Sequence, residues 1–246
     1  MQPFSLLLGL GALAGLLLAG WRAPKKETVH YVDAAVFAMF ISLVGSRVMS
    51  VAMNWGYYAA HLGEIFQVWL GGLSGIGALA SGGLSVIIIA RWWRLPLGVL
   101  ADTLLPLVGA LTITAWLGCW VGTCAYGLPS SAWWAVPVRD EWGMLARRVP
   151  VQLVGATSTL VLIWLMDWAG KRVVLPGLSA GVGLFSISAI IFSLSYWRVD
   201  PMPIWHGLRL EAWGAIGLMI LSALIVVVLL VGWKLKKLPV PERRVP

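Results

Sequence analysis

Long runs of apolar residues alternate with short polar connections along the chain. A helix needs about 20 apolar residues to cross a bilayer, and each run is close to that length. The runs lack the alternation of apolar and polar positions that strands of a membrane barrel show. The predicted spans are Phe4–Trp21, Val32–Met53, Trp69–Ala90, Leu97–Val121, Val151–Trp168, Leu175–Tyr196 and Ala212–Trp233. We therefore predict an all-α polytopic membrane protein with seven transmembrane helices.

Composition supports this class. Of the 246 residues, 60% are hydrophobic and 11% are charged, whereas about 25% are charged in soluble domains. A soluble globule of this size could not bury so many apolar side chains, and disordered chains are poor in them. The net charge is +8, but the basic residues lie between the apolar runs, so topology explains them and no nucleic-acid partner is expected.

The basic residues predict an orientation. Alternate connections carry Arg22, Lys25 and Lys26, then Arg91 and Arg94, then Lys171 and Arg172, followed by a basic C-terminal tail. Connections rich in Lys and Arg lie on the cytoplasmic side. We therefore predict an external N-terminus and a cytoplasmic C-terminus, with a membrane domain over residues 1–233 and a basic cytoplasmic tail over 234–246.

Two external connections are rich in Trp and Tyr, namely Asn54–Val68 and Leu128–Val149. Aromatic residues of this kind lie at the boundary between membrane and water. One interpretation is an ordinary aromatic belt. The other is a pair of segments that cover a site open toward the outer leaflet.

A few polar residues fall within the predicted spans, where charge is costly. Arg47 lies about two turns from the outer end of the second span, and either faces a polar cavity, extends to the outer surface or pairs with a carboxylate. Asp102 opens the fourth span. The three histidines are too dispersed for a metal site. Cys119 and Cys124 would lie about 140° apart on a helix, so a redox pair is not expected.

Several segments, in order, resemble those of the bacterial prolipoprotein diacylglyceryl transferase family. They are GSR at Gly45–Arg47, NWGYY at Asn54–Tyr58, WLGGLSGIGALASG at Trp69–Gly82, ADTLLP at Ala101–Pro106, LGCWVGTCAYG at Leu117–Gly127 and VPVQLVGA at Val149–Ala156. The family patterns are W-x-GG-[LM]-S-x-H-GG, D-x-x-x-P, G-R-x-G-[NC]-F with a closing Y-G, and H-P-x-Q-L-Y-E. The resemblance covers nearly the whole chain.

This resemblance implies transfer of a diacylglyceryl group from phosphatidylglycerol to the lipobox cysteine of a secreted prolipoprotein, at the bacterial cytoplasmic membrane and without a cofactor or metal. The candidate catalytic residues are Arg47, Asp102, Cys119, Tyr126 and Arg198. The candidate substrate-binding residues are Gly71, Gly72, Ser74, Gly77, Gly127, Arg148 and Gln152. Arginine suits the phosphate, and thiolate formation needs a base, for which a carboxylate, His61, His206 or water are candidates.

The departures from the pattern concern the residues that handle protons and phosphate. The implied His, Arg, His and Arg positions hold Ile76, Trp116, Val149 and Ile191. The implied Tyr and Glu that close the last pattern are Val154 and Gly155, while Cys119 and Cys124 stand at implied Asn and Glu positions. Two readings follow: a divergent transferase, or a lipid-binding or scaffolding membrane subunit that keeps the fold. A transporter is a third reading, without a supporting repeat.

Each candidate also has a structural interpretation. The glycines could serve helix packing, Asp102 a helix N-cap, Tyr126 an interfacial anchor, Gln152 a bond between helices, and Arg198 a pair with Asp200. Two geometric expectations separate these roles. Arg47 should point inward toward a cavity near Gly71–Gly77, and Cys119 should line the same cavity.

Overall fold

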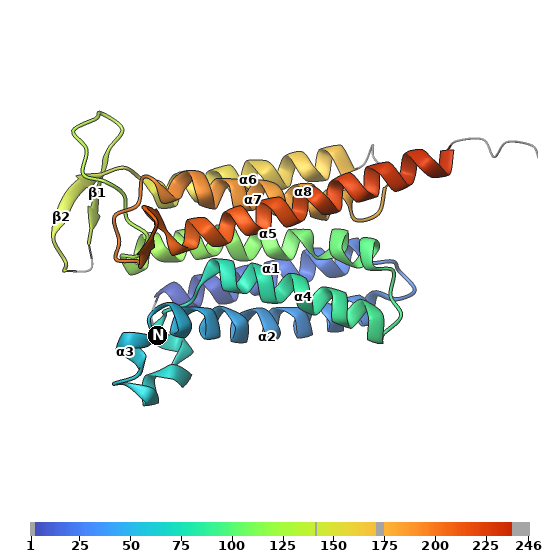
Figure 1. Cartoon of the computed structure of the whole chain (residues 1–246), viewed down its shortest axis with the longest axis horizontal. Helices are drawn as coiled ribbons and strands as arrows, with labels where there is room; N and C mark the ends of the chain where they lie inside the picture. Colours follow the sequence, from blue (N-terminus) through green and yellow to red (C-terminus); the bar gives the residue numbers. More distant parts are fainter. Residues whose placement is uncertain (1–2, 141, 171–174, 238–246) are drawn as a thin grey trace, which may run out of the picture.

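The computed structural model describes residues 3–140, 142–170 and 175–237. Within these residues, seven helices are long and apolar enough to cross a membrane. They are α1 (Pro3–Arg22), α2 (Thr28–Met53), α4 (Gly75–Trp92), α5 (Leu97–Gly122), α6 (Val151–Gly170), α7 (Leu178–Ser195) and α8 (Leu210–Lys237). Figure 1 shows them side by side along one direction. The prediction of an all-α protein with seven membrane-spanning helices is confirmed.

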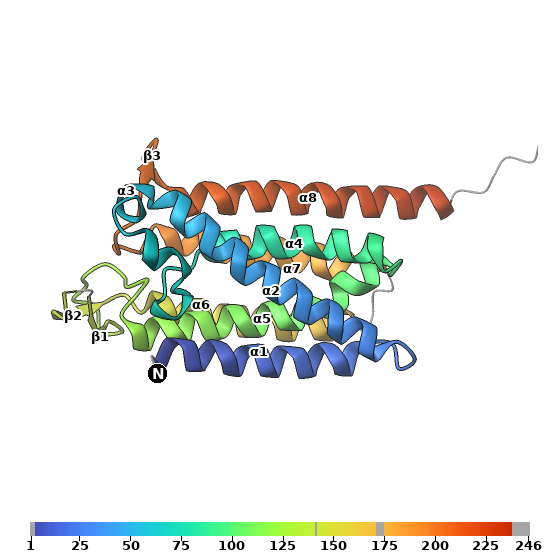
Figure 2. The ribbon, with the colours of Figure 1, turned by 90° about the horizontal axis from the view of Figure 1, so that it is seen from below.

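The short elements gather at one end of this bundle, which we call the loop-rich end (Figures 1 and 2). They are α3 (Trp55–Tyr58), the 3-10 helices η1 (Leu62–Phe66) and η2 (Val68–Leu70), the hairpin of β1 (Val136–Arg139) and β2 (Leu145–Arg148), and the pair β3 (Ile204–Trp205) and β4 (Leu208–Arg209). Both strand pairs are antiparallel. The first residues of α1 lie at this end as well.

The opposite end, which we call the basic end, carries Arg22, Arg91 and Arg94. The last turn of α8 points this way (Figure 2), so the two ends of the described chain lie at opposite ends of the bundle. Lys171, Arg172 and residues 238–246 are outside the described residues. The tail expected from residue 234 begins inside α8. The division at residue 233 and the membrane orientation remain predictions.

The third span begins later than expected. We predicted it over Trp69–Ala90, but α4 covers Gly75–Trp92. Gly71 and Gly72 have φ angles of +94° and +68°, a left-handed conformation that ends regular helix and that glycine adopts at little cost. Ser74 is the N-cap that precedes α4, and its hydroxyl accepts the backbone N–H of Gly77 at 3.2 Å.

Small residues let the helices approach closely, as α1 against α5 illustrates. A Cβ atom added to Gly15 would lie 2.6 Å from a methyl group of Leu107, and one added to Gly11 would overlap Thr114. Such contacts provide helix packing in lipid, where the hydrophobic effect between helices is weak. Large apolar side chains such as Leu17 instead remain exposed on the outer surface, where lipid tails would cover them.

Candidate functional site

Arg47 is buried at the loop-rich end and holds the connection between α3 and α4. Its Nε donates to the carbonyl of Ile65 at 2.9 Å, and its Nη2 donates to the carbonyl of Glu64 at 2.5 Å. Its Nη1 donates to the carbonyls of Gly71 and Gly72 at 2.6 and 2.8 Å. We call this arrangement the Arg47 carbonyl cradle. It uses four of the five N–H groups of the guanidinium.

The contacts of the cradle can be compared with the role that the sequence predicts for Arg47. The side chain points inward and contacts Gly71 and Gly72, as expected, and its guanidinium lies 5.1 Å from the centre of the Tyr58 ring. Among the described residues, no carboxylate forms an ion pair with it. A Cβ atom at Gly72 would lie 2.6 Å from Nη1, so glycine is needed for this contact. The arginine stabilises the loop, and the neighbouring cavity and the phosphate role remain predictions.

The other residues expected near Arg47 have packing or capping contacts. Ser74 caps α4, and its carbonyl accepts the hydroxyl of Ser46 at 2.9 Å. A Cβ atom at Gly77 would lie 2.5 Å from the Cβ of Met49. Ser74 and Gly77 therefore join α4 to α2, which fixes the position of the cradle.

Arg198 lies in a buried network of four charges after α7. Its guanidinium binds both carboxylate oxygens of Asp200, at 2.9 and 2.7 Å, and donates to Glu211 at 2.6 Å. Arg209 donates to the backbone carbonyl of Asp200 at 2.9 Å and lies 3.1 Å from its carboxylate. The expected Arg198–Asp200 pair is present, and the network as a whole is electrically neutral.

Burial acts to lower the pKa of both arginines, but their charged partners compensate for it to different extents. Burial works to lower the pKa of Arg198, but Glu211 and Asp200 outweigh it, so the pKa is raised. The pKa of Arg209 is lowered, mainly by burial and also by the charge of Arg198, with Asp200 opposing the change. Arg198 is therefore firmly held as a cation by its partners, whereas Arg209 is less well compensated.

A third cluster joins the hairpin to the helix ends. Arg148 donates to Asp140 at 3.0 Å and lies 4.9 Å from the centre of the Tyr126 ring. It also donates to the carbonyl of Gly127 at 3.4 Å. Gln152, which is fully buried, donates to the carbonyl of Cys124 at 2.9 Å. These contacts bring together residues that are far apart in the sequence.

The second and third clusters are continuous. Gly127 and Arg198 form an antiparallel backbone bridge, and the N–H of Val199 donates to the carbonyl of Tyr126 at 3.0 Å. The structure thus brings together five predicted site residues at the loop-rich end: Tyr126, Gly127, Arg148, Gln152 and Arg198.

Asp102 lies elsewhere. It is in the second turn of α5 at the basic end, and its carboxylate accepts the N–H groups of Gly177 and Ala180, both at 2.7 Å. These donors belong to the start of α7. Asp102 therefore caps another helix rather than its own and lies away from the other candidates at the loop-rich end, and its catalytic role remains a prediction.

Cys119 and Cys124 form a disulfide, with Cα atoms 4.6 Å apart. The expectation that they would not pair was wrong because α5 ends at Gly122. Thr123 then has a φ angle of +59° and turns the chain back, so that helix geometry does not apply to Cys124. Cys119 carries no free thiol, and it packs beside apolar residues; its expected place in a cavity near Arg47 and its catalytic role remain predictions.

The four positions at which the resemblance implies His or Arg lie together in space. Ile76, Trp116, Val149 and Ile191 belong to one buried apolar cluster, with exposed fractions of 3 to 8%. We call these four residues the apolar centre. Each comes from a different part of the fold, so their convergence gives spatial support to the resemblance. In this chain all four of these positions are occupied by hydrophobic side chains.

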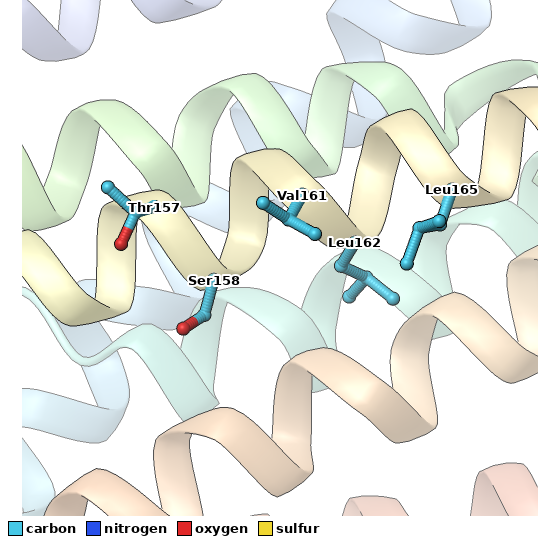
Figure 3. Close-up of a pocket in the computed structure, with 5 residues that line it drawn as sticks. All are labelled: Thr157, Ser158, Val161, Leu162 and Leu165. Carbon is cyan, nitrogen blue, oxygen red and sulfur yellow. The ribbon is translucent and has the colours of Figure 1, made fainter.

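A hollow of about 380 Å³ lies on α6 and is drawn in Figure 3. Five residues line it: Thr157, Ser158, Val161, Leu162 and Leu165. None of the predicted site residues is among them. These residues lie in the middle of α6, away from both ends of the bundle.

Sequence reasoning missed two polar residues of the site. Neither Arg209 nor Asp140 is among the residues predicted for the site. Asp140 is 7% exposed and partners Arg148, while Arg209 partners Asp200. The available signal was the presence of several arginines in the external connections, because a buried arginine needs a charged partner or several hydrogen-bond acceptors.

Comparison with known proteins agrees with the resemblance. The family model for prolipoprotein diacylglyceryl transferase matches residues 1–230. A phosphatidylglycerol–prolipoprotein diacylglyceryl transferase of Streptomyces griseus is 30% identical over 231 residues, covering 88% of this chain and 70% of the relative. One from Thermosynechococcus vestitus is 25% identical and covers 100% of this chain and 93% of the relative. This chain belongs to the prolipoprotein diacylglyceryl transferase family.

Proposed function

We propose that this protein transfers a diacylglyceryl group from phosphatidylglycerol to the lipobox cysteine of an exported precursor protein, in the cytoplasmic membrane of a bacterium. The observation that carries the proposal is the family match over residues 1–230. The names of relatives that cover most of the chain support the same reaction. Both substrates would reach the protein from the membrane, which suits a bundle of seven apolar helices.

The reaction places two demands on the site. The thiol sulfur forms a bond to a glycerol carbon, the bond from that carbon to the phosphate oxygen breaks, and glycerol phosphate leaves with the electron pair. The thiol proton passes to a base. Positive charge and N–H donors favour the leaving phosphate, and a nearby base increases the thiolate fraction.

The arginines of the loop-rich end would meet the first demand. The Nε groups of Arg148 and Arg209 have no hydrogen-bond partner among the described residues. Gly127 lies between the two arginine clusters, since it accepts from Arg148 and bridges Arg198. A phosphate would receive donors from both sides only after the packing around the buried Gly127 opens, because an added Cβ atom there would overlap the carbonyl oxygen of Val149.

His61 would meet the second demand. Its ring stacks on Tyr57 with centroids 4.4 Å apart, and it is exposed at the loop-rich end. It precedes η1, whose residues Glu64 and Ile65 are held by the Arg47 carbonyl cradle. A neutral imidazole in this position could act as the base that takes the thiol proton.

The test is transfer of labelled diacylglyceryl from phosphatidylglycerol to a lipobox peptide by the purified protein in lipid nanodiscs. Transfer by the unmodified protein, with a strong loss for His61→Ala, would support both the reaction and the base. Transfer that His61→Ala leaves unchanged would remove His61 but keep the function. Absence of transfer, while a family transferase is active in the same assay, would overturn the proposal.

A second candidate function is a lipid-binding or scaffolding subunit without catalysis, and the apolar centre favours it. Ile76, Trp116, Val149 and Ile191 fill with hydrophobic side chains the place where the resemblance implies proton transfer and phosphate binding. Native mass spectrometry distinguishes this candidate. It predicts retained phosphatidylglycerol that stays intact during incubation with the peptide, whereas the transferase would consume it.

A further inference from the structure

The β1–β2 hairpin exposes a group of large apolar side chains at the loop-rich end. Trp133 is 90% exposed, Trp142 is 80% exposed, and Met144 and Leu145 are more than 60% exposed. Exposed apolar groups of this size in water are unusual unless they meet a partner. We call these four residues the hairpin patch.

The turn of the hairpin is organised so that its apolar side chains face outward. Asp140 is buried, and one of its carboxylate oxygens accepts the backbone N–H groups of Trp142 at 3.0 Å and Met144 at 2.9 Å. The other oxygen accepts from Arg148. The polar side chain of the turn therefore points inward, and Trp142 and Met144 are held in an exposed conformation.

The segment before β1 is organised in a similar way. The Nη2 of Arg147 donates to the carbonyl of Ala135 at 2.9 Å and to that of Trp133 at 3.3 Å. This contact fixes the segment that carries Trp133 against the hairpin. Both aromatic positions are thus preorganised, which lowers the ordering cost of binding.

The strands divide into an inward and an outward face. Val138 and Arg148 are buried, whereas Pro137, Arg139 and Leu145 are exposed. Register pairs Arg139 with Leu145 and Pro137 with Arg147, so the outward face combines cationic and apolar side chains. This combination is typical of segments that lie on anionic membranes.

The position of the hairpin suits such a surface. Figure 1 shows the strands lying across the bundle axis at the helix ends, rather than extending away along that axis. The N–H of Leu128 donates to the carbonyl of Trp197 at 2.9 Å, which attaches the segment leading to the hairpin directly beyond α7. Since the helix ends mark the edge of the bilayer, the hairpin would lie at the depth of the lipid headgroups.

We propose that the hairpin patch docks on the anionic headgroup region of the membrane leaflet at the loop-rich end, with Trp133 and Trp142 entering it. The apolar side chains of the patch favour contact with the membrane over contact with water. The basic residues Arg139 and Arg147 favour anionic headgroups. The docking does not depend on catalysis, so its test is independent of the test of the proposed function.

The experiment places an environment-sensitive NBD label at Trp142→Cys in the full-length protein, in nanodiscs that contain phosphatidylglycerol. Because Cys119 and Cys124 form a disulfide, only the introduced thiol reacts under non-reducing conditions. Trp133→Cys provides a second position if the first variant fails to fold. Lys26→Cys, in the exposed polar connection between α1 and α2, is the control.

We expect blue-shifted emission at both tryptophan positions and loss of at least half of the fluorescence when the headgroup carries a nitroxide quencher. The control should show neither change. Water-like, unquenched emission at the tryptophan positions would overturn the proposal. So would a shift that appears only when an apolar peptide is added, because the patch would then bind polypeptide.

Discussion

The indole of Trp116 in α5 lies against Gly155 in α6, so closely that a Cβ atom added at residue 155 would lie 2.6 Å from the ring. The resemblance implies Arg at the first position and Glu at the second. This chain has a large apolar side chain at one position and no side chain at the other. The large indole of Trp116 fills the space that the missing side chain of Gly155 leaves. The two residues therefore keep α5 and α6 in contact through apolar packing instead of an ion pair.

The fit between these two residues predicts a steric effect. Gly155→Ala should destabilise the protein by about 1 to 3 kcal/mol, because the added methyl group overlaps a buried indole. Thermal unfolding in detergent measures the effect. Gly83→Ala is the matched control, since Gly83 is exposed in α4 and has no atom within 4 Å of the added Cβ. Equal changes in the two variants would contradict the packing argument.

The Arg47 carbonyl cradle predicts a local change in dynamics. Arg47→Lys keeps the charge but cannot reach four carbonyls with one ammonium group. Losing one or two charge-assisted hydrogen bonds, each worth about 1.5 to 3 kcal/mol, should raise hydrogen exchange in residues 62–72 roughly tenfold or more. Mass spectrometry of the peptides reports this change.

The control for Arg47 is Arg139→Lys, which alters an exposed arginine in β1 at the same end. Exchange in residues 62–72 should then stay at its original rate. Unchanged exchange in Arg47→Lys itself would mean that the loop holds its conformation without the cradle.

Asp102 predicts a loss of stability at the basic end. Asp102→Ala removes the acceptor for two N–H groups at the start of α7, which should cost roughly 0.5 to 2 kcal/mol. Asp102→Asn retains an oxygen acceptor and should lose less. Thermal unfolding compares the two variants. Lipid binding should be unchanged in both, and its loss would support a role for Asp102 in the site.

The disulfide predicts a simple chemical result. The denatured protein, kept oxidised, should take up no maleimide, and it should take up two equivalents after reduction. Intact-mass measurement counts them. Labelling before reduction would show that Cys119 and Cys124 are free thiols.

The sequence was sufficient for the spans because apolar length alone determines whether a helix can cross a bilayer. It was insufficient wherever backbone conformation interrupts an apolar run. Gly71 and Gly72 adopt left-handed angles within an apolar stretch, and their carbonyls bind an arginine from α2. Nothing in the local pattern of residues indicates such a distant partner.

The site was partly predictable for a similar reason. The place of Tyr126, Gly127 and Gln152 at the loop-rich end could be predicted, because all three lie near the predicted external ends of the fourth and fifth spans. The capping contact of Asp102 could not be predicted because its partners are 75 and 78 residues away. The disulfide was not predicted because the angle of about 140° between the two cysteines holds only if the helix continues past Gly122.

The contact of Asp102 with the start of α7 also has a mechanical consequence. It attaches α7 to α5 at the basic end, whereas the arginine clusters lie beyond the opposite end of α7. A helix of this length spans about 27 Å at 1.5 Å per residue. The other end of α7 is also attached, because Val199 bonds to Tyr126 and Leu128 bonds to Trp197 just beyond it. α7 is therefore held against the α5 side of the bundle at both ends, and it can tilt only if one of these two attachments breaks.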